Sequence, residues 1–305
     1  MSWTANEMPD LGGKTIVVTG ANSGLGLEAS RAFARRRARV VLACRNVEKA
    51  EAARNDILGS APGADVEARP LDLASLASVR AFAESFLSSH GRLDVLCNNA
   101  GVMALPRRET VDGFEMQFGT NHLGHFALTG LLLPLLERTP KARVVTQSSS
   151  AHRMGRIDFD DLQGRQHYWR WRAYGQSKLA NLLFTYELQR RLEKKNADVI
   201  SVACHPGYAA TELQFAAARM ERLTWMEHLF ALGNRLFAQD AATGSLPMLY
   251  AATAPDVHGG DYIGPDAFAE LWGYPVKVDS SAASHDVPSA AHLWEVSRDL
   301  TGVRC

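Results

Sequence analysis

A tyrosine and a lysine four residues apart are the side chains best suited to chemistry in this 305-residue sequence. Tyr174 and Lys178 share one face if the segment is helical, because residues i and i+4 are neighbours on a helix. A free phenol has a pKa of about 10, and a nearby ammonium stabilises its phenolate. The pair could therefore move a proton to or from a substrate oxygen. The same spacing also occurs on exposed helix faces, and what favours chemistry here is the position one helix after the fifth expected strand.

Three serines and one asparagine could act beside this pair. The apolar run Arg143–Gln147 is followed directly by Ser148, Ser149 and Ser150. A hydroxyl there could stabilise charge on a substrate oxygen, although three serines could also form only a polar turn. Asn121 interrupts a helical pattern in which Asn has poor propensity. It indicates either a local break whose freed carbonyl holds a water, or a tolerated polar residue.

A glycine-rich turn precedes the first expected helix. The run Thr19–Gly26 reads TGANSGLG and follows the apolar run Thr15–Thr19. Glycines there let the backbone approach a pyrophosphate, and the helix start offers it free N–H groups. A tight turn alone is the alternative. The predicted contacts of a dinucleotide with this turn are Gly20, Asn22, Ser23, Gly24, Leu25 and Gly26.

The end of the second expected strand indicates which dinucleotide is preferred. An acidic residue there would bind the ribose hydroxyls of NAD, but the sequence has Cys44 and Arg45. A guanidinium can pair with a 2′-phosphate. We therefore predict that NADP(H) is preferred over NAD(H). The alternative is that Arg45 only caps the surface loop.

Two later loops should complete this cofactor site. Asp72, next to Leu73, could accept a hydrogen bond from the adenine amino group, or could be the N-cap of the next helix in competition with Ser75. Small and amide-bearing residues after the fourth strand fit a loop beside the cofactor at the carboxyl edge of a sheet. The residues expected to contact it there are Asn98, Ala100 and Gly101.

Short apolar runs alternate with helical patterns along the chain. This alternation predicts an α/β fold, a doubly wound parallel sheet of the Rossmann type with helices on both faces. Without an evident linker, we expect one domain over residues 1–305, with a core at about 11–265, a helical substrate lid at 208–237 and a C-terminal extension at 266–305. The expected strands are Thr15–Thr19, Arg39–Ala43, Val66–Pro70, Leu93–Cys97, Arg143–Gln147 and Val199–Cys204. The expected helices are Leu25–Arg37, Val47–Leu58, Leu76–Ser88, Phe114–Glu137 and Ala173–Glu193.

Composition argues against several other classes of protein. The 33 basic and 33 acidic residues cancel, so no charge excess favours nucleic acid or an anionic membrane as a partner. The four cysteines are far apart, and His122 and His125 lack an evident third ligand, so we expect no metal. The longest apolar stretch, Phe126–Leu136, is too short to span a bilayer. We therefore expect a cytoplasmic protein without a membrane anchor.

Together these motifs resemble the short-chain dehydrogenase/reductase family over Leu11 to Gly264. Within it, the chain is similar to the retinol dehydrogenase and protochlorophyllide reductase-like branch. The segments that carry this second resemblance are Ala43–Asn46, Asn121–Phe126 and Ser177–Asn181. Gln147 departs from the branch, which usually has an aliphatic residue there. The resemblance implies the strand order 3-2-1-4-5-6-7.

The resemblance also implies roles. Tyr174 would be the general acid/base, Lys178 would lower its pKa and hold the nicotinamide ribose, and Ser149 would bind the substrate oxygen. Asn121 would anchor a proton-relay water. Hydride transfer would be direct, without a metal. The residues implied beside the nicotinamide are Pro206, Gly207 and Thr211.

The resulting hypothesis is an NADP(H)-dependent oxidoreductase that interconverts a carbonyl and an alcohol, with an apolar substrate. The alternative is a catalytically silent NADP(H)-binding sensor or scaffold. The proposed lid could instead be an amphipathic helix pair covering the sheet edge. Members of the family often pair through the helices at 114–137 and 173–193, so a homodimer and a homotetramer both stay open.

Overall fold

The computed structural model of the protein describes residues 2–208 and 239–304. These residues build an eight-stranded sheet in the order β3-β2-β1-β4-β5-β6-β7-β8. Pairing is parallel from β3 to β7, which confirms the predicted order. The strands are β1 Thr15–Thr19, β2 Arg39–Cys44, β3 Val66–Pro70, β4 Val95–Asn98, β5 Ala142–Gln147, β6 Val199–Cys204, β7 Tyr262–Pro265 and β8 Pro275–Lys277.

The eighth strand was not predicted. It pairs antiparallel with β7 and has three residues, of which only Pro275 is buried. So short a strand contains no apolar run or alternation, and a periodicity argument cannot detect it.

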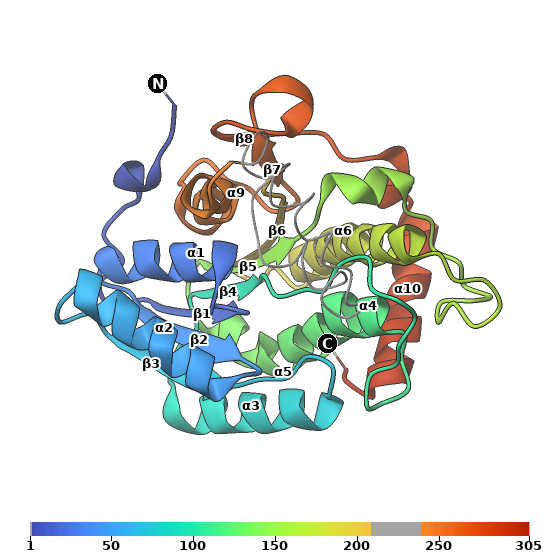
Figure 1. Ribbon diagram of the computed structural model, residues 1–305, viewed down its shortest axis with the longest axis horizontal. Coiled ribbons are helices and arrows are strands. Elements are labelled where there is room, and N and C mark those ends of the chain that lie inside the picture. Colours follow the sequence, from blue (N-terminus) through green and yellow to red (C-terminus); the bar gives the residue numbers. More distant parts are fainter. Residues whose placement is uncertain (1, 209–238, 305) are drawn as a thin grey trace, which may run out of the picture.

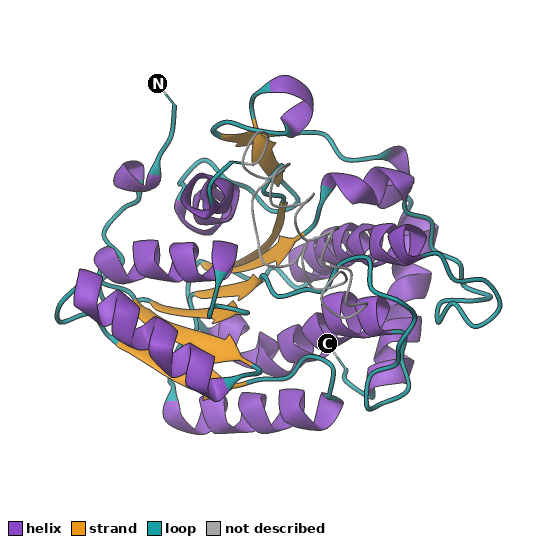
Figure 2. Ribbon diagram, in the orientation of Figure 1, coloured by secondary structure: helices purple, strands orange, loops and turns teal. Residues whose placement is uncertain are grey.

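Helices cover both faces of the sheet (Figure 2). Helices α1, α2 and α9 pack on one face, and α3, α5, α6 and α10 pack on the other. Figure 1 shows α1 and α9 on the side of the sheet opposite α3 and α5. The helices are α1 Gly24–Arg35, α2 Val47–Ser60, α3 Leu76–Ser89, α4 Met116–Phe118, α5 Gly124–Arg138, α6 Arg170–Lys194, α9 Ala241–Thr253 and α10 Val287–Thr301.

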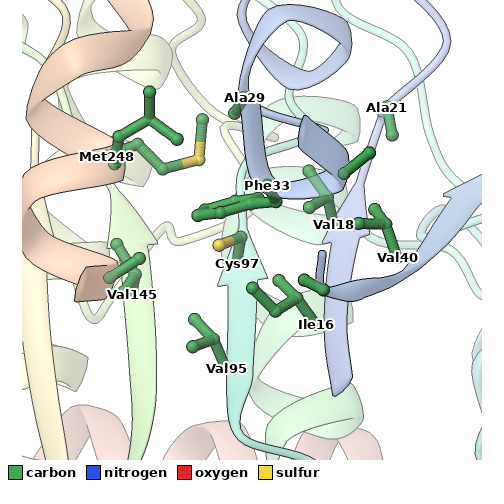
Figure 3. Close-up of a cluster of buried hydrophobic side chains, with 14 of the residues drawn as sticks. Ile16, Val18, Ala21, Ala29, Phe33, Val40, Val95, Cys97, Val145 and Met248 are labelled. Atoms are coloured by element: carbon green, nitrogen blue, oxygen red, sulfur yellow. The ribbon is translucent and has the colours of Figure 1, made fainter. Parts of the chain in front are cut away.

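The central strands are buried on both faces, as their unbroken apolar sequences predict. In β1, Ile16 and Val18 point into the core under α1 and α9, whereas Val17 points into the opposite core. Figure 3 shows Phe33 of α1 between Val18 of β1 and Met248 of α9. The thiols of Cys44, Cys97 and Cys204 are free and buried. This arrangement sets the carboxyl ends of the parallel strands at one edge, where a doubly wound sheet binds its ligands.

The expected helix over 114–137 is broken. A short α4 leads into a π-helical turn at Gly119–Leu123, and α5 begins at Gly124. The turn contains Asn121, so the local break predicted there is confirmed. A side chain at Gly124 would overlap the carbonyl oxygen of Leu73, so only glycine allows this close approach.

The C-terminal segment is integrated with the rest of the chain. Strand β8 extends the same sheet, and α10 packs along α6 with Trp294 stacked on Phe184 at 5.8 Å between ring centres. Within the described residues, no helix is both long and apolar enough to cross a bilayer. The predicted lid lies outside the described residues except for Tyr208.

Candidate active site

A cavity of about 620 Å³ runs along the carboxyl edge of the sheet, from the glycine turn to α6. It collects residues from the ends of several strands, as expected for a doubly wound sheet. Most residues predicted from the sequence lie on its wall. They are Gly20, Asn22, Ser23, Gly24, Leu25, Gly26, Arg45, Asp72, Leu73, Ala100, Gly101, Ser149, Tyr174, Lys178, Pro206 and Gly207. Thr211 lies outside the described residues.

The glycine turn is shaped for close approach of a ligand. Gly20 has a φ of +66°, and a Cβ there would lie 2.9 Å from the Cβ of Ala100. A Cβ on Gly26 would lie 2.5 Å from the carbonyl oxygen of Gly20. Ser23 is the N-cap of α1, but its side chain makes no capping hydrogen bond. The first N–H groups of a helix have no partner within the helix, so this wall fits a pyrophosphate.

Arg45 and Asp72 lie on the same wall. Arg45 follows β2 and is exposed, which suits pairing with a 2′-phosphate. Ser75, and not Asp72, caps α3, because its side chain accepts the N–H of Ser78. The Asp72 carboxylate accepts the N–H of Ala74 at 3.0 Å and still faces the cavity. Asp72 is therefore not the N-cap of α3, and its contact with the adenine amino group stays a prediction.

Cys44 supports the glycine turn. Its thiol accepts backbone N–H groups of Ala21 and Asn22, and burial raises its pKa to about 11. It is therefore a neutral thiol near neutral pH and not a nucleophile.

Helix α6 brings Tyr174 and Lys178 to the other end of the cavity. Both side chains are buried, and the Lys178 ammonium lies 5.7 Å from the centre of the Tyr174 ring. Burial raises the pKa of Tyr174 to about 12, and a hydrogen bond from Ser149 opposes that shift. Burial lowers the pKa of Lys178 to about 8. The three predicted groups of the catalytic cluster are therefore together.

The expected lowering of the Tyr174 pKa by Lys178 is not seen in this structure. Desolvation disfavours the phenolate more strongly than its surroundings favour it. The Lys178 ammonium instead donates to the carbonyl oxygen of Gln147 at 3.1 Å. The phenol is therefore a weaker acid than a free tyrosine.

Two predicted amides do not line the cavity. Asn98 is fully buried, and its amide donates to Thr129 at 3.0 Å; Asn99 lines the cavity in its place. Asn121 is also buried, and its side chain holds both the N–H and the carbonyl of Val102, at 2.8 and 2.9 Å. Asn121 therefore supports the cavity wall through Val102, which does line the cavity.

The two histidines after Asn121 are fully buried in separate contacts. His122 lies 2.8 Å from the hydroxyl of Ser297, and His125 lies 2.9 Å from the hydroxyl of Thr19. Burial lowers their pKa values to about 3 and about 4. Among the described residues, no three potential ligands converge on a metal site.

Gln147 was unexplained from the sequence. Its side-chain oxygen accepts the thiol of Cys204 at 3.0 Å, and its carbonyl accepts Lys178 and Asn181. The polar side chain is therefore satisfied, and the backbone carbonyl of the same residue contacts Lys178. Met154 and Trp171, both missed by the sequence argument, also line the cavity. Trp171 precedes Tyr174 by three residues on α6, so helical spacing could have indicated it, whereas Met154 ends the short helix after Ser149 and no local motif indicates it.

Comparison with known proteins decides the family. The family model described as short chain dehydrogenase matches residues 14–222. Retinol dehydrogenase 12 of Mus musculus is 42% identical over 297 residues, covering 96% of this chain and 87% of that protein. The chain belongs to the short-chain dehydrogenase/reductase family. Within it, the relatives support the retinol dehydrogenase-like branch.

Solved structures agree with this family. An uncharacterised protein from Mycobacterium Paratuberculosis has a TM-score of 0.83 and 43% identity, covering 100% of this chain and 99% of that chain. A short chain dehydrogenase from Escherichia coli CFT073, described as complexed with NADPH, has a TM-score of 0.65 and 25% identity, covering 83% and 97%. A short-chain dehydrogenase/reductase is an oxidoreductase that uses a nicotinamide cofactor, and this cavity has the expected glycine turn.

Proposed function

We propose that this short-chain dehydrogenase/reductase interconverts a carbonyl and an alcohol with NADP(H), using Tyr174 as general acid/base. The observation that carries the proposal is the contact of Ser149 with Tyr174 beside Lys178, in the cavity that begins at the glycine turn. A phenol, a hydroxyl and an ammonium in one buried site can hold and protonate an oxyanion.

In carbonyl reduction, the Ser149 hydroxyl would donate to the substrate oxygen. A nicotinamide bound in the cavity would supply the hydride that the substrate carbon accepts. Tyr174 would then give its proton to the developing alkoxide, and Lys178 would stabilise the resulting phenolate. Alcohol oxidation is the reverse, with the phenolate as the base. Asn121 would shape the site through Val102, and a relay water on its carbonyl would share that oxygen with Nδ1 of His125, 3.0 Å away.

Two observations support the choice of cofactor and substrate. Arg45 on the adenosine side favours a 2′-phosphate, and the similar Escherichia coli structure is described as an NADPH complex. Met154 and Trp171 give the catalytic end of the cavity an apolar rim. The curated relatives are named retinol dehydrogenases, so a long apolar aldehyde or alcohol is the proposed substrate class.

The test is NADPH oxidation with retinal and a panel of smaller aldehydes and ketones. Tyr174→Phe should lower kcat/KM by at least about 100-fold, because the proton donor is lost. NADPH binding, followed by its fluorescence, should change little in the same variant. Undiminished turnover by Tyr174→Phe contradicts the proposal. NADPH binding without oxidation by any carbonyl would instead favour the sensor or scaffold.

A further inference from the structure

His152 connects the catalytic serine to a distant part of the chain. Its ring Nδ1 donates to the carbonyl oxygen of Ser149 at 2.7 Å, and its Nε2 accepts the backbone N–H of Ser281 at 3.1 Å. One neutral tautomer makes both contacts, since it has one donor and one acceptor nitrogen. The ring is almost fully buried, and burial lowers its pKa to about 4.

Ser281 belongs to the C-terminal extension, between β8 and the short 3₁₀ helix Ala282–His285. The same extension makes a second contact with the serine turn, because Arg153 donates to the carbonyl of Asp279 at 2.8 Å. Arg153 also pairs with Glu270 at 3.2 Å. The extension thus contacts the turn after Ser149 through both His152 and Arg153.

Glu270 also links the C-terminal extension to a second turn on the cavity wall, the one at residues 205–207. Its second carboxylate oxygen lies 3.1 Å from Nε2 of His205, the residue before Pro206 and Gly207 on the cavity wall. Glu270 adopts a φ of +59°, a conformation that side-chain-bearing residues rarely adopt. Such a conformation persists where surrounding contacts determine it. Here those contacts join the extension to both turns.

We propose that the C-terminal extension positions Ser149 through His152, and that Ser281 supplies the hydrogen bond that orients the His152 ring. His152 is thus a positioning residue and not a catalytic one. The inference rests on the role of Ser149 in the proposed function. Ser149 must keep its hydroxyl against Tyr174, and a misplacement of about 1 Å in a catalytic site can cost about 100-fold in rate.

Ser281 allows a test on a single N–H group. Its φ is −66°, the value that a proline ring imposes, and it precedes a 3₁₀ helix. Its hydroxyl is buried with no hydrogen-bond partner among the described residues. Ser281→Pro therefore removes the donor to His152 and puts a ring carbon in its place, which displaces the His152 ring, and Ser281→Ala is the matched control that keeps the N–H.

We expect Ser281→Pro to lower kcat about tenfold while Ser281→Ala keeps wild-type kcat. Binding of NADPH by fluorescence should be the same for both variants, since Ser281 does not line the cavity. The thermal unfolding midpoint of each variant should show a single cooperative transition, as expected of a folded protein. Equal kcat values for the two variants would overturn the inference. His152→Phe should reproduce the loss, and His152→Asn, which can still donate to the Ser149 carbonyl, should recover part of it.

A double variant separates this inference from the proposed function. If the extension acts through Ser149, then Ser281→Pro should slow the enzyme no further once Ser149→Ala is present. An additional tenfold loss of kcat in the double variant would show that Ser281→Pro acts on the enzyme independently of Ser149. Full activity of Ser149→Ala alone would refute the role of Ser149 itself, whatever Ser281→Pro does.

Discussion

Tyr174 is protonated at neutral pH in this structure, since burial raises the pKa of its phenol to about 12. A protonated phenol is the form that donates to an alkoxide, whereas alcohol oxidation needs the phenolate. Lys178 has the opposite shift, to about 8, and so carries its positive charge only below that pH. The free protein therefore has a neutral phenol at position 174 and a largely charged ammonium at position 178 near neutral pH.

The pH dependence of the two directions should differ. Alcohol oxidation should accelerate as pH rises from about 6 to about 8, because the small phenolate fraction of Tyr174 grows with pH. Carbonyl reduction should stay level there and decline above about pH 8, where Lys178 loses its charge. Steady-state kcat/KM profiles in both directions measure this. The Lys178→Met variant should show no decline of carbonyl reduction above about pH 8. A decline that persists in this variant would contradict its assignment to Lys178.

Arg45 should decide between the two dinucleotides. Arg45→Ala removes a guanidinium that can pair with a 2′-phosphate, a contact of about 1.5–3 kcal/mol. We expect kcat/KM with NADPH to fall at least about tenfold, with little change for NADH. Arg35→Ala, at the exposed end of α1, is the matched control. A wild-type preference for NADH would refute the prediction.

At the scale of elements, the site depends on where helices begin. Helix α1 starts at Gly24 and directs its first turn at the cavity, and α5 starts only after the π-helical turn that holds Asn121. That turn is held by His125, whose Nδ1 lies 3.0 Å from the carbonyl of Asn121. A π-turn inside a helix often marks a functional site.

Gly124 should be required where α5 begins. Gly124→Ala places a methyl group against the carbonyl of Leu73, so we expect a loss of about 2 kcal/mol or more in the free energy of unfolding. Gly59→Ala, in α2 with open space around it, should instead be neutral or stabilising by up to about 1 kcal/mol. Urea unfolding of both variants measures the difference. Similar effects would contradict the close contact.

At the scale of the whole molecule, the two cores contain buried polar groups whose charge states matter for stability. His122 and His125 are neutral in the folded protein, with pKa values of about 3 and about 4 against 6.5 unperturbed. The unfolded chain therefore binds protons first as pH falls. The stability they contribute is complete above about pH 6.5 and is lost as pH falls toward 4.

Acid should thus destabilise the protein through these histidines. Between about pH 7 and pH 5, each should remove about 2 kcal/mol from the free energy of unfolding. His122→Phe, among Phe118, Phe126 and Phe184, should lose less stability over that range than the wild type. His167→Gln, at an exposed histidine, should follow the wild type. Urea midpoints at the two pH values measure this; a His122→Phe slope equal to that of the wild type contradicts the assignment.

Local patterns were enough to predict the strands from β1 to β6, the glycine turn and the pairing of Tyr174 with Lys178. Each of these features depends on residues that are close in sequence. Apolar periodicity indicates the strands and the helical pair, and the backbone freedom of glycine indicates the turn. Strand β8 and the choice of Asn99 over Asn98 were missed. Strand β8 has too few residues to show an alternation of apolar and polar residues. Whether Asn98 or Asn99 lines the cavity depends on the direction in which each side chain points at the end of β4.

The sequence by itself determined the family of the fold, the cofactor turn and the chemical types available for catalysis. Only the tertiary structure decided the rise in the Tyr174 pKa, the satisfied environment of Gln147 and the contact of His152 with Ser281. Burial and contacts between segments 129 residues apart depend on how elements pack in space. Spacing along the chain does not contain that information, because packing joins residues that no local period relates.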